Sequence, residues 1–353
     1  MKITRYENFR RLTRTGRAEW IPFTLDVGAV PGFTKPGLER FEEVTGSSQP
    51  EEFFDYDFRV ASLTAHFAGD DPAVLHGAAP AGTTFDEWGI GHWAGGAAGT
   101  HEKTFPPLAT AESVADVESF PTPAIDTGRP DALVRAYHER GYPVCGYAGS
   151  IYEWSWWLRG MQGFMMDLLA NVSLAEAIIG NVAEYTKTLA LESAKAGIDV
   201  LCFYDDAGMQ TGMQISPELW RRFIKPRWRD VLDTVRHRHP DTVFFLHSCG
   251  NIEAIVPDII DVGFHILHPV QPECMDFQAI RKRYGRGLIL CATISAQNLF
   301  PFGTPNEVRK WTHRVKDLCS SDNRAILCPS NLIQPETPWD NIVAFAEAAR
   351  VQG

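Results

Sequence analysis

The amino-acid sequence predicts one α/β domain over residues 1–353, folded as a single (β/α)₈ TIM-type barrel. The chain has 353 residues, of which 44% are hydrophobic, which suits a large single core of this kind. Short apolar runs alternate with longer amphipathic ones along most of the sequence. Several short runs are apolar throughout, which is typical of parallel strands that are covered on both faces. A doubly wound open sheet would give a similar pattern and is the alternative.

Eight apolar runs are the predicted strands, of which the first two are the weakest. They cover residues 21–28, 58–65, 143–149, 199–206, 243–250, 264–270, 288–294 and 325–331. Helices are predicted between the later strands at residues 174–196, 216–238, 251–261, 276–284, 305–319 and 339–350, where apolar residues recur at helical spacing. Ser216, Asp276 and Thr304 are the expected caps, and Pro217 and Pro305 suit a first helical position.

Residues 69–122 are rich in Gly, Pro, Ala and Thr and show few helical patterns. We expect them to form a long loop excursion after the second strand that covers the mouth of the barrel. Long loops of this kind are often functional.

Charge and cysteine content limit the class of protein. The formal net charge of −11, from 44 acidic and 33 basic residues, disfavours a protein that binds a nucleic-acid backbone. The sequence has no apolar run of about 18 residues, so no membrane span is expected, and its start lacks the apolar core of a signal peptide. The seven cysteines are odd in number and widely spaced, which indicates free thiols in a reducing cytoplasm.

Polar residues follow six of the predicted strands. The C-terminal ends of barrel strands meet at one mouth, where active sites of this fold form. We therefore expect Asp206, His247, Gln271 and Asn331 to lie together at one end of a closed parallel barrel. The polar residues at these strand ends are Ser150, Tyr152, Glu153, Tyr204, Asp205, Asp206, His247, Cys249, His268, Gln271, Glu273, Thr293, Ser295, Gln297, Ser330 and Asn331.

A metal site is indicated by His247 and Cys249, which are two residues apart at a strand end. Side chains two apart in an extended segment face the same side, and imidazole and thiolate are ligands that zinc prefers. A third ligand must come from another strand. Cys328 is the best remaining thiol, and Glu273, Cys274 and His268 are the other candidates. The same pair also fits a structural thiol beside a substrate-binding histidine.

The remaining candidates divide by chemistry. Asp205, Asp206 and Glu153 suit acid–base catalysis or substrate orientation, although one aspartate of the pair could equally serve as a cap or support a ligand histidine. Of Trp154, Trp156 and Trp157, we expect two to pack on a helix face and one to line a substrate pocket. The predicted substrate-binding residues are Tyr152, Trp154, Tyr204, Gln271 and Asn331.

Five stretches together resemble the uroporphyrinogen decarboxylase superfamily and cover most of residues 140–345. They are LRGMQGFMMDLLANVSLAEAI (158–178), YDDAGMQTGMQISPELWRRFIKPRWRDVLD (204–233), HSCGNIEAIVPDIIDVGFHILHPVQ (247–271), ISAQNLFPFGTPNEVR (294–309) and ILCPSNLIQPETPWDNI (326–342). The resemblance implies a (β/α)₈ barrel with its site in the mouth.

Two branches of the superfamily make different demands on the sequence. True uroporphyrinogen decarboxylases use an arginine-rich N-terminal segment for a substrate with several carboxylates, but no arginine occurs from Ile21 through Thr34. The cobalamin-dependent methyltransferases bind zinc through His-x-Cys and a later cysteine, and His247 and Cys249 match the first two ligands. Asn331 stands where the later cysteine is expected. The third ligand is therefore open between Cys328, three residues earlier, Glu273, and Asp205 or Asp206, and a site without metal is a further alternative. Cys328 is slightly favoured, because a bulge at Pro329 would re-aim its side chain, and Glu273 is the main alternative.

The resemblance is closer to the methyltransferase branch. It implies transfer of a methyl group from a small methylated substrate, such as an O-methyl aromatic in an O-demethylation, to a corrinoid protein or related acceptor. The cofactors implied are zinc and a corrinoid (cobalamin) carried by a partner protein, and a homodimer is compatible with it. The alternatives are a metal-free decarboxylase or lyase acting on a smaller carboxylate, with His247 and Asp206 handling protons, and a non-catalytic corrinoid- or ligand-binding protein.

Overall fold

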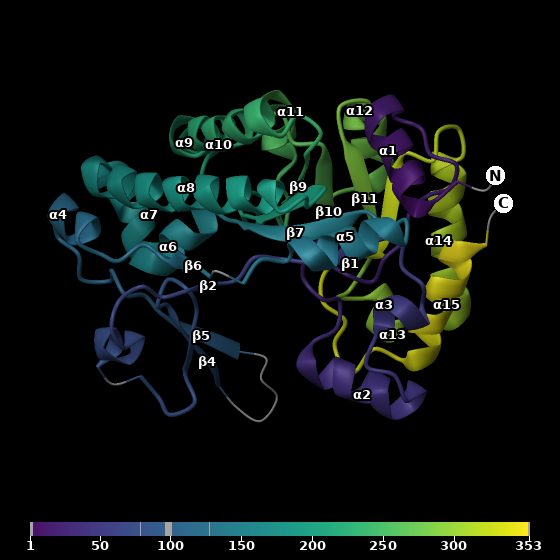
Figure 1. Ribbon diagram of the computed structural model, residues 1–353, viewed down its shortest axis with the longest axis horizontal. Coiled ribbons are helices and arrows are strands. Elements are labelled where there is room, and N and C mark those ends of the chain that lie inside the picture. The colour runs from purple at the N-terminus through teal and green to yellow at the C-terminus, as the bar shows by residue number, and fades with distance from the viewer. Residues whose placement is uncertain (1–2, 78, 96–100, 127, 352–353) are drawn as a thin grey trace.

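A computed structural model describes residues 3–77, 79–95, 101–126 and 128–351. Within this part of the chain, seven parallel strands form one curled sheet in the order β1-β7-β8-β9-β10-β11-β12 (Figure 1). The α/β fold is consistent with a TIM-type architecture, as predicted. The strands are β1 (Arg59–Val60), β7 (Val144–Gly149), β8 (Val200–Tyr204), β9 (Val243–His247), β10 (Ile266–Val270), β11 (Ile289–Ile294) and β12 (Ala325–Pro329).

The first predicted strand, residues 21–28, is not a regular strand. Phe23 forms one isolated parallel bridge with Leu327 of β12, and its carbonyl accepts a 2.9 Å hydrogen bond from the Asp57 N–H, just before β1. The segment therefore lies between the two edges of the sheet without continuing the ladder. Val27 and Val30 then close a tight turn, with Gly28 between them at φ 64°, so the chain reverses before a longer strand can form.

Both faces of the sheet are apolar, which explains why the strands read as continuous hydrophobic runs. One face, including Leu201, Phe244 and Leu267, packs against helices on the outside. The other face fills the interior with Val200, Phe245 and other side chains, and Phe9 and Leu12 of helix α1 close that interior. The core of the fold therefore has an inner and an outer layer, as in a barrel.

Helices follow the strands along the chain, and the predicted caps are confirmed: the side chains of Ser216, Asp276 and Thr304 each accept a hydrogen bond from the first turn of the helix they precede.

No helix in the described ranges is both long and apolar enough to cross a membrane. The helices are α1 (Arg5–Thr15), α2 (Lys35–Thr45), α3 (Pro50–Phe53), α5 (Asp131–Glu139), α6 (Tyr152–Arg159), α7 (Met161–Ala170), α8 (Val172–Lys195), α9 (Pro217–Phe223), α10 (Lys225–Arg238), α11 (Val256–Val262), α12 (Phe277–Tyr284), α13 (Leu299–Phe302), α14 (Pro305–Cys319) and α15 (Trp339–Arg350).

The chain between β1 and α5 contains short antiparallel strands that the composition of residues 69–122 did not predict. Strands β3, β4 and β5 form one small sheet. Strands β2 and β6, which precede and follow these three in the sequence, pair with each other in a second sheet. Trp88 is fully buried against Trp154 of α6 and Tyr185 of α8, which anchors this segment to the main domain. Its expected place over the mouth stays a prediction. The elements are β2 (Ala65–His66), η1 (Pro72–His76), β3 (Thr84–Phe85), β4 (Gly91–Gly95), β5 (His101–Phe105), α4 (Val114–Glu118) and β6 (Ala124–Ile125).

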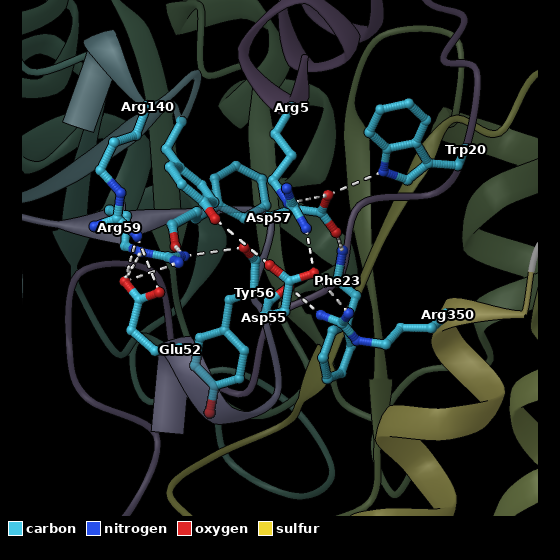
Figure 2. Close-up of polar contacts among 12 residues, drawn as sticks. Arg5, Trp20, Phe23, Glu52, Asp55, Tyr56, Asp57, Arg59, Arg140 and Arg350 are labelled. Carbon is cyan, nitrogen blue, oxygen red and sulfur yellow. Dashed lines mark hydrogen bonds and ion pairs between the residues drawn. The ribbon is translucent and has the colours of Figure 1, made fainter. Parts of the chain in front are cut away.

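A charged cluster ties the two ends of the chain to the N-terminal side of the sheet (Figure 2). The carboxylate of Asp55 pairs with Arg5 of α1 and, at 2.9 Å, with Arg350 of α15. The carboxylate of Asp57 accepts 2.9 Å hydrogen bonds from the indole N–H of Trp20 and from the backbone of Phe23. These residues precede β1, so the cluster lies at the end of the sheet opposite the C-terminal strand ends and supports the fold there.

Candidate active site

Polar side chains from four strand ends meet at the C-terminal end of the sheet. His247 Nε2 lies 3.5 Å from Asp206 Oδ1 and 3.3 Å from Cys249 Sγ. Asn331 Nδ2 lies 3.6 Å from the same sulfur, and Gln271 Oε1 accepts a 2.8 Å hydrogen bond from the Gly250 N–H beside it. Asp206, His247, Gln271 and Asn331 therefore lie at one end of the parallel sheet, as predicted. In the described residues this sheet is a curled one of seven strands, so the closed barrel predicted with them stays a prediction.

The loop after β9 places Cys249 by direct backbone packing. Gly250 has φ 83°, and a Cβ atom there would lie 2.5 Å from the backbone of Gly208, so only glycine fits. The close approach brings the Cys249 N–H to 2.7 Å from Asp206 Oδ1, where the carboxylate accepts it. The two loops therefore fix the thiol and the carboxylate relative to each other.

Asp206, His247 and Cys249 each offer one donor atom, and these atoms all lie within 4.8 Å of one another. Burial lowers the pKa of His247 to about 4, which leaves the imidazole neutral and able to bind a metal. Burial, together with the charges of Asp206 and Glu153, raises the pKa of the Cys249 thiol. Burial also raises the pKa of Asp206.

These shifts disfavour two negative charges side by side, and a bound cation would remove that penalty. One nitrogen, one sulfur and one oxygen donor are a set that zinc accepts, and three protein ligands leave a fourth position for substrate. The residues present therefore fit zinc.

Cys328, the residue slightly favoured as third ligand, does not join this cluster. It lies in β12 with 1% of its surface exposed, in the interior layer of the sheet beside Cys291 and His268. Burial opposes ionisation of the thiol, but hydrogen bonding with Cys291 and the neighbouring His268 favour it and bring its pKa to about 6. Its chemistry suits a ligand, whereas its position is one layer below the cluster.

The two adjacent aspartates have different surroundings. The Asp205 side chain is buried and accepts hydrogen bonds from Ser150 Oγ at 2.9 Å, from the backbone N–H groups of Ile151 and Glu153 at 3.1 and 3.0 Å, and from Trp228 Nε1 at 2.9 Å. It thereby holds the start of α6 against β8. Asp205 supports the site from behind, and Asp206 faces it.

Replacing Asp205 with alanine is expected to destabilise the fold by about 3 kcal/mol, because buried donors in Ser150, Glu153 and Trp228 lose their acceptor. Chemical denaturation followed by circular dichroism measures the change. The matched control is Asp233→Ala, whose partly exposed carboxylate pairs within one helix and whose loss should change stability by less than about 0.5 kcal/mol. Equal stability of the two variants would contradict the supporting role.

A cavity of about 260 Å³ opens beside the donor cluster. Five of its lining residues were candidates from the sequence: Glu153, Trp154, Tyr204, Asp206 and His247. Ser150 was named as a polar strand-end residue and Trp157 as one of three tryptophans considered for a pocket wall. Only Tyr147, which lies in the apolar run of β7, was missed, because it carried no separate signal. The full lining is Tyr147, Ser150, Glu153, Trp154, Trp157, Tyr204, Asp206 and His247.

Two of the three tryptophans of α6 line the cavity, whereas one was expected to line it and two to pack against the protein core. Trp154 and Trp157 both line the cavity because residues three apart share a helix face. Trp156 points elsewhere and packs on the outer core. The expectation of a single lining tryptophan was therefore wrong, and the i,i+3 spacing is the signal that would have corrected it.

The other predicted residues lie around the cavity rather than in its wall. The Tyr152 hydroxyl donates to Gln214 Oε1 at 3.2 Å from a fully buried ring. Glu273 accepts hydrogen bonds from Ser295 and Asn298, which draws its carboxylate toward β11. Substrate binding by Tyr152, Gln271 and Asn331, and metal binding by Glu273, stay predictions.

The fold and the site together define an α/β enzyme-like domain with a donor cluster at its C-terminal strand ends. The chain belongs to the uroporphyrinogen decarboxylase (URO-D) family, whose profile matches residues 101–351. It is 28% identical over 192 residues to the methylcobamide:CoM methyltransferase MtaA of Methanosarcina barkeri, covering 54% of this chain and 53% of the relative. MtaA of the Fusaro strain is 27% identical over 192 residues. The chain thus spans about half the length of the curated relatives it matches.

A solved structure supports the fold over nearly the whole chain. A methyltransferase from Methanosarcina mazei superposes with a TM-score of 0.70 and 18% identity, covering 99% of this chain and 98% of the other. At that identity the likeness concerns the fold alone. The family match and the named relatives fit the corrinoid methyltransferase branch that the sequence motifs indicated.

Proposed function

We propose that this protein transfers a methyl group from a small methylated substrate to a corrinoid carried by a partner protein, at a zinc-assisted centre formed by Asp206, His247 and Cys249. The observation that carries the proposal is the convergence of these donor atoms within 4.8 Å, beside a cavity of about 260 Å³ whose wall includes Asp206 and His247. The curated relatives support the corrinoid part of the proposal, because they are methylcobamide:CoM methyltransferases. That name makes the cobamide the methyl donor, so the direction of transfer proposed for this chain rests on its own cavity.

Bound zinc would act as a Lewis acid toward the heteroatom of the substrate and make it a better leaving group. The chain itself supplies the ligands and the geometry. Asp205 holds the start of α6, and α6 in turn presents Glu153 and the tryptophans to the cavity. Backbone packing at Gly250 fixes Cys249 against Asp206.

Glu153 is the proposed acid–base residue. It lines the cavity, and its Oε2 accepts the Asp206 N–H at 3.3 Å, so it lies next to the donor cluster. In the proposed reaction the bond between methyl and heteroatom breaks, the methyl group passes to the corrinoid, and the heteroatom keeps the electron pair. Glu153 then provides the proton that the heteroatom takes up.

The cavity wall favours a small and largely apolar substrate. The rings of Tyr147 and Tyr204 stack 5.3 Å apart, and Trp154 packs edge-on against Tyr147 at 6.1 Å. Flat aromatic walls of this kind suit an O-methyl aromatic substrate. Among the described residues that line the cavity, none is a lysine or arginine that could clamp a carboxylate, which disfavours the decarboxylase alternative.

The test is methyl transfer from O-methyl aromatics to reduced free cobalamin, followed by the absorbance of methylcobalamin. Zinc-loaded wild type should be active, and Glu153→Gln should lower the rate by about 100-fold because the general acid is lost. The control Glu218→Gln changes an exposed carboxylate on α9 and should match wild type. Release of carbon dioxide from small carboxylates, with no methyl transfer, would support the decarboxylase instead.

A further inference from the structure

A second histidine lies directly behind His247. His268 of β10 is paired in register with His247 of β9, and the two rings stack with centroids 4.9 Å apart. Their Nδ1 atoms are 2.8 Å apart, which is a hydrogen-bond distance, so one of the two must carry the hydrogen. His268 has no exposed surface, so its ring nitrogens depend on partners within the protein.

The main-chain carbonyl of Pro329 decides which of the two Nδ1 atoms carries the hydrogen of the His247–His268 hydrogen bond. His268 Nε2 lies 3.0 Å from Pro329 O, and a carbonyl oxygen can only accept. Nε2 of His268 therefore donates, and in a neutral imidazole Nδ1 is then an acceptor. The hydrogen between the two rings consequently belongs to His247 Nδ1.

This arrangement leaves a lone pair on His247 Nε2. That atom lies 3.3 Å from Cys249 Sγ and 3.5 Å from Asp206 Oδ1, so the lone pair is in the donor cluster. In the opposite tautomer Nε2 would carry a hydrogen and could not bind a metal.

We propose that His268 is a positioning residue that holds His247 in its metal-binding tautomer. The chain of hydrogen bonds from His247 through His268 to the Pro329 carbonyl, here called the relay, is fixed at the carbonyl because that oxygen can only accept. This inference rests on the proposed metal centre. It also gives the last strand a role there: β12 contributes through a main-chain oxygen, which acts through His268 of β10 on a ligand in β9, three positions away in the sheet.

The direction of the relay can be read without any substitution. Correlation spectra of the metal-free protein, with ¹⁵N in its histidine rings, distinguish protonated from unprotonated ring nitrogens. We expect His247 to be protonated at Nδ1 and unprotonated at Nε2. A hydrogen on His247 Nε2 would overturn the inference, and a doubly protonated His268 paired with a Cys328 thiolate would produce that result.

Two substitutions of His268 test its effect on metal binding, measured as the zinc dissociation constant by chelator competition. His268→Leu removes the acceptor and should weaken zinc binding by about 10- to 100-fold. His268→Asn places an amide oxygen near the position of Nδ1 and should restore most of the affinity. His265→Asn is the control, because His265 Nδ1 accepts from the Phe244 backbone and faces away from the site.

Wild-type affinity in a folded His268→Leu variant would overturn the relay, and equal losses in the Leu and Asn variants would reduce His268 to a packing role. Failure of the proposed function has a different signature. If His247→Ala and Cys249→Ser keep their zinc, the metal centre itself is wrong, and the tautomer of His247 in the wild-type spectrum still decides the relay.

Discussion

Cys249→Ser is expected to lose most of the zinc that the wild-type protein retains at about one ion per chain. A serine hydroxyl is nearly the same size as the thiol, so the loop held at Gly250 should keep its conformation. The serine hydroxyl does not ionise at neutral pH, however, and so cannot replace a thiolate as a zinc ligand. Elemental analysis of protein purified without added metal measures the loss, and His247→Ala should show the same effect.

The matched control for this substitution is Cys274→Ser. Cys274 is also partly buried, and its thiol donates to Gln210 Oε1 at 3.2 Å, outside the donor cluster. This variant should keep its zinc. Near-zero zinc in gently purified wild type would remove the metal from the mechanism, and full zinc in Cys249→Ser would remove the thiol from the metal site.

The parts of the fold that the sequence predicted are those in which local pattern and burial agree. Residues 243–250 read as a strand buried on both faces followed by a ligand pair, and β9 and His247 lie as that pattern predicts. Residues 21–28 have a similar pattern, but a turn at Gly28 interrupts them. The short strands of residues 84–105 depend on pairing with one another and on the burial of Trp88, neither of which is visible in local composition.

The site shows the same division. The sequence could bring Asp205 and Asp206 to the end of β8, but only the contacts of Ser150 and Trp228 assign Asp205 to support and Asp206 to the cavity. The carbonyl of Pro329 could not be predicted at all, because every residue has one and its role depends on where the backbone lies. The sequence therefore predicts which side chains lie at the strand ends, but it does not predict the roles of main-chain groups there.

Those strand-end contacts lead to the identity of the third ligand. We expect Asp206→Asn to weaken zinc binding at least about tenfold, because an amide oxygen is a poorer donor than a carboxylate at the same position. Asp206 Oδ1 is 3.5 Å from His247 Nε2 and accepts the Cys249 N–H, so the carboxylate is already oriented. The asparagine can still accept that hydrogen bond, which separates loss of a ligand from loss of the loop.

Cys328→Ala and Glu273→Gln are the competing tests, measured by the same chelator competition. Cys328 packs in the interior layer, so its alanine variant should keep zinc and lose about 1 kcal/mol of stability, as expected for a small buried group. Glu273 is held by Ser295 and Asn298, so its glutamine variant should also keep zinc. A loss in Cys328→Ala as large as in Cys249→Ser, with Asp206→Asn unchanged, would instead make the thiol of the last strand the third ligand. That result would require the Cys328 side chain of β12 to move from the interior layer toward the donor cluster when the metal binds.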